Sequence, residues 1–186
     1  MNRWRDNGLH YGRVTRLLHW AMAALFAWQF LGMGLRLALG RTPLVSFFVG
    51  THASIGLLLM FLAALRALWG IFNLRNRPAH GTGWIGAAAR LGHLALYALI
   101  LCVPLLAILR AYGSQRGATF FGIPIIPGAP QKLEWMVSLG NAAHGLLAWA
   151  LLALVAGHIA MVFIHRHVWK DDVWARMAGR QLQAAE

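Results

Sequence analysis

The stretch that decides the fold is HGLLAWALLALVAGH, residues 144–158, an unbroken apolar run with a histidine at each end. Two side chains fourteen residues apart on an α-helix lie within about 40° of one face and about 21 Å apart along the axis. An ionisable side chain inside a membrane span is energetically costly, so it is a functional candidate by default. This helix therefore predicts two functional sites, one in each half of a membrane.

Three other apolar stretches come close to the roughly 20 residues that cross a bilayer core. In a chain of 186 residues with 59% hydrophobic side chains, four such stretches leave little sequence for a soluble domain. We expect a single transmembrane domain over residues 1–186, with helices at about 15–36, 44–72, 88–110 and 138–166. Short connections make neighbouring helices antiparallel, which predicts an all-α, up-down four-helix membrane bundle with its cofactor sites in the core.

The distribution of basic residues predicts the orientation of this bundle. The formal net charge is +12, and with four spans both termini and the 73–90 link lie on the same side of the membrane. That side carries most of the 17 lysines and arginines, while the other side has Arg36, Arg41, Arg110, Arg116 and Lys132. The positive-inside rule then places both termini in the cytoplasm. The charge indicates topology and contact with lipid headgroups rather than nucleic-acid binding.

The histidines of the first two spans match those of the last span in depth. His19 lies just inside the cytoplasmic face, level with His158, and His52 lies in the outer half, level with His144. Histidine is an axial ligand of haem iron in many proteins, and two neutral imidazoles on one iron favour electron transfer over oxygen activation. We therefore predict two haems, one held by each pair. Depth alone also admits His93, near the inner end of the third span.

Arg66 follows His52 by fourteen residues and lies on the same face at the inner end of the second span. It is a candidate partner for an inner haem propionate or a quinone carbonyl, and equally a snorkelling arginine at a helix end. Cys102 is the only cysteine, which excludes an internal disulfide, an iron–sulfur cluster and covalent Cys-x-x-Cys-His haem attachment. The spans contain no Asp or Glu, which disfavours a remote alternative, a histidine-based metal-ion transporter.

Short motifs distributed over the whole chain resemble the bacterial cytochrome b561 family. They are TRLLHW (15–20), THASIG (51–56), RLGHL (90–94) and HVWKD (167–171), together with Arg66, His144 and His158. This resemblance implies a four-helix diheme b-type cytochrome of the bacterial inner membrane. It also implies that His19, His52, His144 and His158 are the axial ligands and that His93 is not one, which selects His19 for the inner pair.

The outer loop suggests the substrates. YGSQRG (112–117) and the pair Phe121-Gly122 resemble the loop of family members that oxidise periplasmic superoxide and reduce ubiquinone. Arg110, Arg116 and Lys132 would attract a small anion to this face, although contact with phospholipid headgroups would explain them too. We expect a superoxide:ubiquinone oxidoreductase. The alternative is a membrane-anchoring cytochrome b subunit that passes electrons between a hydrogenase or dehydrogenase and the quinone pool.

Overall fold

The computed structural model describes residues 4–78, 83–171 and 173–179. Four long helices dominate this part of the chain: α1 (Arg13–Leu39), α2 (Pro43–Phe72), α3 (Gly83–Gly113) and α4 (Glu134–His167). Each is long and apolar enough to cross a membrane, which confirms the predicted helical membrane bundle. The helices extend a few residues beyond the expected bounds, most clearly at the start of α3. Hydropathy marks the part of a helix that lies in hydrocarbon, and the backbone hydrogen bonds continue past it.

The turn between α1 and α2 is tight because both helix ends are capped. Gly40 ends α1 with a φ of 66°, and its N–H donates to the carbonyl of Arg36. Glycine adopts this left-handed conformation without steric cost. The Thr42 side chain accepts a hydrogen bond from the Val45 N–H at 3.2 Å, and Pro43 occupies the first turn of α2. The two helices therefore return along each other.

Packing is most extensive between α1 and α2 and between α3 and α4, and α2 also packs on α3. The buried core lies midway along the bundle, with members from all four long helices: Met22, Ile55, Leu59, Ala63, Ile100 and Leu151. These side chains lie between the depth of His19 and His158 and the depth of His52 and His144. The bundle thus has a dry apolar layer between its two histidine pairs.

The link between α3 and α4 contains two short antiparallel strands, β1 (Ala118–Phe120) and β2 (Ile123–Ile126). Phe121 and Gly122 form the turn with φ values of 46° and 88°, as a two-residue hairpin turn of type I′ requires. The Phe121 N–H donates to the buried Ser54 Oγ of α2 at 2.8 Å. The hairpin, an addition to the expected all-helical fold, is therefore docked on the bundle.

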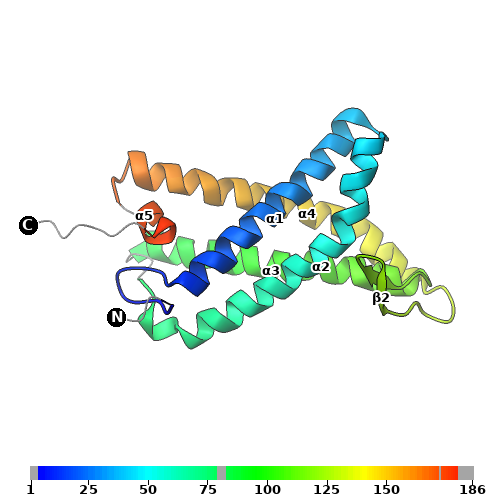
Figure 1. Ribbon diagram of the computed structural model, residues 1–186, viewed down its shortest axis with the longest axis horizontal. Coiled ribbons are helices and arrows are strands. Elements are labelled where there is room, and N and C mark those ends of the chain that lie inside the picture. Colours follow the sequence, from blue (N-terminus) through cyan, green and yellow to red (C-terminus); the bar gives the residue numbers. More distant parts are fainter. Residues whose placement is uncertain (1–3, 79–82, 172, 180–186) are drawn as a thin grey trace, which may run out of the picture.

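A short helix, α5 (Val173–Ala178), lies at the opposite end of the molecule from β2 (Figure 1). The Trp174 ring contacts the Trp20 ring with centroids 5.6 Å apart, and the Trp20 indole N–H donates to the Met177 carbonyl at 3.3 Å. These contacts fold α5 back onto the start of α1. It covers the end of the bundle near His19.

Candidate functional site

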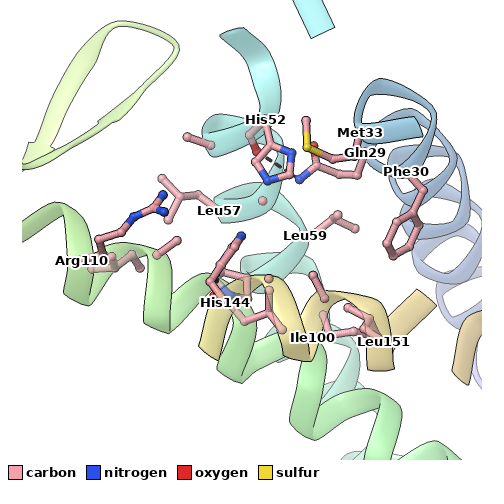
Figure 2. A pocket seen from close by; sticks show the side chains of 18 of the residues that line it. Gln29, Phe30, Met33, His52, Leu57, Leu59, Ile100, Arg110, His144 and Leu151 are labelled. Carbon is pink, nitrogen blue, oxygen red and sulfur yellow. Dashed lines mark hydrogen bonds between the residues drawn. The ribbon is translucent and has the colours of Figure 1, made fainter. Parts of the chain in front are cut away.

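His52 on α2 and His144 on α4 face each other across a cavity in the half of the bundle that the sequence predicts to be the outer one (Figure 2). Their ring centroids are 6.2 Å apart and the ring planes are inclined by 73°. A five-membered ring with bonds of about 1.35 Å has its atoms about 1.1 Å from its centre, and imidazole nitrogen binds a metal at about 2.0–2.1 Å. Two imidazoles on opposite sides of one ion therefore have centroids about 6.2–6.4 Å apart. The observed separation fits a shared metal.

The cavity has a volume of about 530 Å³, within the range of about 300–1,000 Å³ typical of cofactor sites. Its lining is mainly apolar and comes from all four long helices and β1. A Cβ added at Gly34 or Gly145 would meet no atom within 4 Å, so these glycines leave room for a flat group between the helices. Arg36 and Arg110 supply guanidinium groups to the same wall.

The Nδ1 atoms of the two histidines in the outer pair differ in their hydrogen bonding. The Nδ1 of His144 lies 3.0 Å from the carbonyl oxygen of Val103. A carbonyl only accepts, so Nδ1 is the donor and Nε2 keeps a free lone pair for a metal, as in metal-bound histidines generally. The Nδ1 of His52 is buried and has no hydrogen-bond partner among the described residues. The donor set fits two neutral imidazole ligands, of which only one has its N–H paired.

The inner pair repeats the separation of the outer one. His19 on α1 and His158 on α4 have ring centroids 6.2 Å apart, with the planes inclined by 68°. His93 lies closer to His158, at 5.3 Å, which is too short for two imidazoles on opposite sides of one ion. Its Nδ1 donates to the Ala89 carbonyl at 2.7 Å, one turn earlier on α3. The geometry therefore favours His19 over His93 as the partner of His158.

Each site has two facing histidines and no larger ligand set. Within the described ranges, no group of three or more His, Cys, Asp or Glu side chains could hold a metal ion. An ion bound by protein alone usually needs about four ligands. Two facing histidines instead suit a metal whose remaining positions are filled by a macrocycle.

A model of the prokaryotic cytochrome b561 family matches residues 10–180. The chain belongs to this family. It is a multi-pass membrane cytochrome of a family that binds b-type haem and transfers electrons. The chain is similar to cytochrome b561 homolog 2 of Escherichia coli (strain K12), with 28% identity over 178 residues, 91% of this chain and 92% of that protein. It is also similar to cytochrome b561 homolog 1 of the same organism, with 29% identity over 100 residues, 53% of this chain and 55% of that one.

The end of the bundle that carries His19 and His158 has several buried guanidinium nitrogens without hydrogen-bond partners among the described residues. The side-chain Nε atoms of Arg16, Arg66 and Arg176 are buried and lack hydrogen-bond partners among the described residues. Arg66 lies over the Tyr97 ring at 5.7 Å. Burial raises the pKa of Tyr11 at this end, although Arg77 opposes the shift. Anionic haem propionates are the kind of group these guanidinium nitrogens suit.

The three basic residues predicted to attract superoxide have different surroundings. Arg110 lies on the wall of the outer cavity, and its Nη1 is 3.5 Å from the Asn141 side-chain oxygen. Lys132 forms an exposed ion pair with Glu134 at 2.8 Å. Arg116 is exposed beside the hairpin. Only Arg110 is thus a neighbour of the outer histidine pair, and the role of all three stays a prediction.

Sequence reasoning missed two residues of the outer cavity, Arg36 and Gln29. Arg36 was considered only as a charge that reports topology. Gln29 is the amide side chain of an otherwise apolar stretch of α1, and this polarity was the available signal. Its Nε2 donates to the main-chain oxygen of His52 at 3.1 Å, a contact that depends on how α1 is rotated against α2.

Proposed function

We propose that this protein is a diheme b-type cytochrome that carries electrons across the bacterial inner membrane. The observation that carries the proposal is the pair of matched histidine separations, 6.2 Å between His52 and His144 and 6.2 Å between His19 and His158. Each bound haem b would supply reversible one-electron oxidation and reduction of its iron. A dry apolar layer separates the two pairs.

The four histidines are proposed as the axial ligands, two to each haem. Neutral imidazole on both faces leaves no coordination position for oxygen, which favours electron transfer. The Val103 carbonyl holds the His144 ring with Nε2 free. The open space beyond Gly34 and Gly145 admits the flat macrocycle. These features of the chain support two haem b cofactors, and more of the supporting features belong to the outer site than to the inner one.

Arginines are proposed to hold the haem propionates or, at the inner end, a quinone carbonyl. Arg66, with Arg16 and Arg176, provides buried and unpaired guanidinium nitrogens at the cytoplasmic end. Arg36 and Arg110 provide the same group on the wall of the outer cavity. A guanidinium group can bind a carboxylate through two parallel hydrogen bonds, so it is well suited to a propionate.

Superoxide is the proposed periplasmic donor and ubiquinone the proposed acceptor. The support is the loop resemblance described above and the positive charge of Arg110, Arg116 and Lys132, which would attract a small anion. A second candidate is a cytochrome b subunit of a hydrogenase or dehydrogenase. The exposed apolar side chains of Phe121, Ile123 and Ile125 on the hairpin favour it, because a larger partner would cover them.

The first test is a pyridine haemochrome assay with a reduced-minus-oxidised spectrum of the purified protein. We expect two b haems per chain. His144→Ala should lose the outer haem and keep the inner one, and His158→Ala should do the reverse. One haem or none in the unmodified protein would refute the diheme proposal, and two haems retained in His144→Ala would refute the pairing.

The donor is tested separately by stopped-flow spectroscopy. Superoxide should reduce the haems of the purified protein, and an added ubiquinone analogue should reoxidise them. Haems that stay oxidised with superoxide would refute this donor, and co-purification of a larger periplasmic enzyme would then favour the subunit role. Reporter fusions at both termini test the proposed orientation, which predicts that each reporter is cytoplasmic.

A further inference from the structure

Gln29 lies next to His52 in the outer cavity, and Figure 2 shows the hydrogen bond that joins them. The Gln29 Nε2 donates to the main-chain oxygen of His52 at 3.1 Å. Gly56, one turn after His52, lies beside this contact: a Cβ there would be 3.5 Å from the same Nε2, an ordinary van der Waals distance. The amide is therefore held against the part of α2 that carries the histidine.

Two buried polar atoms in this contact have no hydrogen-bond partner among the described residues. They are the Gln29 Oε1, an acceptor, and the His52 Nδ1, which is the donor when Nε2 faces a metal. A buried polar group without a partner is energetically unfavourable, so each of these atoms gains from a hydrogen bond. The two residues are already joined through the Gln29 amide nitrogen, so an acceptor without a donor and a donor without an acceptor belong to side chains in contact with one another.

The two histidines of the outer pair differ in whether the Nδ1 atom has a hydrogen-bond partner. The His144 Nδ1 already donates to the Val103 carbonyl at 3.0 Å. A metal-bound histidine almost always donates its second ring N–H to a carbonyl, carboxylate or water, and that bond sets the ring orientation and the basicity of the ligand. On the His52 side, the unpartnered side-chain oxygen of Gln29 is the same kind of acceptor as the main-chain oxygen that serves His144.

We propose that Gln29 is a positioning residue for His52, whose Nδ1–H donates to the Gln29 Oε1 when the imidazole binds the outer haem iron. This inference rests on the proposed haem ligation by His52. The hydrogen bond increases electron donation from the imidazole, which stabilises ferric over ferrous iron. Gln29 therefore lowers the midpoint potential of the outer haem relative to a site with no acceptor at this position.

The test compares three variants of the full-length haem-loaded protein. Gln29→Leu removes the acceptor at similar volume, Gln29→Glu keeps an oxygen acceptor, and Met33→Leu is a control on the wall of the same cavity. The readouts are the midpoint potential of each haem and the electron paramagnetic resonance g-values of the ferric form. Gln29→Leu should raise the midpoint potential of one haem by about 59 mV. For one electron this corresponds to a change of about tenfold in the relative affinity of the site for the ferric over the ferrous form. Gln29→Glu should stay at or below the wild-type value.

Loss of the outer haem from Gln29→Leu, with its retention in Gln29→Glu and Met33→Leu, would also support the proposal. If Gln29→Leu shifts neither potential more than Met33→Leu does, the proposal is wrong. It is equally wrong if Gln29→Glu rises as far as Gln29→Leu. His52→Ala separates this failure from that of the proposed function: an outer haem that survives His52→Ala refutes the ligand assignment, whatever Gln29 does.

Discussion

Replacing Asp6 with alanine should destabilise the end of the bundle that carries His19 and His158 and loosen the inner site first. The side chain of Asp6 is buried, with the residue 4% exposed. Its Oδ1 accepts hydrogen bonds from the Gly12 N–H at 2.8 Å and the Thr15 hydroxyl at 2.6 Å, and its Oδ2 pairs with the Arg77 Nε at 3.2 Å. The carboxylate therefore ties the segment before α1 to the segment that follows α2.

The magnitude follows from the burial of this ion pair. Removing one partner of a buried pair costs about 3–5 kcal/mol, because the other charge is left without compensation. The Arg77 side chain is 20% exposed, so water relieves part of the penalty and we take the lower end, about 3 kcal/mol. For a chain of this length, about 1 kcal/mol corresponds to 2–4 °C in the melting temperature. Asp6→Ala should thus melt about 6–12 °C lower.

The assay is thermal unfolding in detergent at a fixed scan rate, followed by tryptophan fluorescence, with haem release recorded in parallel. Glu134→Ala is the control, because it breaks the exposed Lys132–Glu134 pair at a cost of at most about 1 kcal/mol. Thr15 accepts a hydrogen bond from the Trp69 indole at 3.0 Å and lies one turn before His19. Loss of the Asp6 carboxylate should therefore disturb the inner site, and the haem bound there should dissociate first. A melting temperature for Asp6→Ala no lower than that of Glu134→Ala would refute the reasoning.

Two further predictions concern the histidine assignment and helix packing. His93→Ala should keep both haems, since the 5.3 Å separation from His158 excludes a shared iron; the haemochrome ratio checks this, and loss of one haem would contradict it. Gly140→Ala should lower the melting temperature by about 2–12 °C, or about 1–3 kcal/mol, because its Cβ would lie 2.5 Å from the Arg110 Cβ and 2.9 Å from the Leu106 carbonyl oxygen. Gly50→Ala, whose Cβ meets nothing within 4 Å, is the matched control, and equal melting of the two would disprove the close approach of α3 and α4.

The helical fold was predictable because membrane spans are defined by length and hydropathy, two properties that the sequence displays directly. The spacing of His144 and His158 on one helix predicted two sites, and the depth rule then paired these residues with His52 and His19. The structure brings the same pairs to 6.2 Å. Depth could not separate His19 from His93, since both lie at the inner level; the family resemblance selected His19, and the distances between the rings agree with that choice.

What the sequence did not reveal depends on tertiary contacts. The ion pair of Asp6 with Arg77 joins residues 71 positions apart. A single aspartate before a helix gives no indication in the sequence of so distant a partner. The short helix α5 depends on the contact between Trp174 and Trp20. The hairpin turn has one local signal, Gly122, whereas Phe121 at a φ of 46° is held there by the docking of its N–H on Ser54.

The arrangement of the histidines has a consequence for the stability of the bundle. Packing is most extensive within two helix pairs, α1 with α2 and α3 with α4. Both histidine pairs instead join α4 to a helix of the other half, His158 to His19 on α1 and His144 to His52 on α2. A group bound between facing histidines therefore connects the halves where direct helix packing is weaker. A ligand that binds only the folded chain stabilises it, and the stabilisation grows with the logarithm of its affinity. Under the proposed function, the same four side chains thus set the redox sites and fasten the two halves of the bundle together.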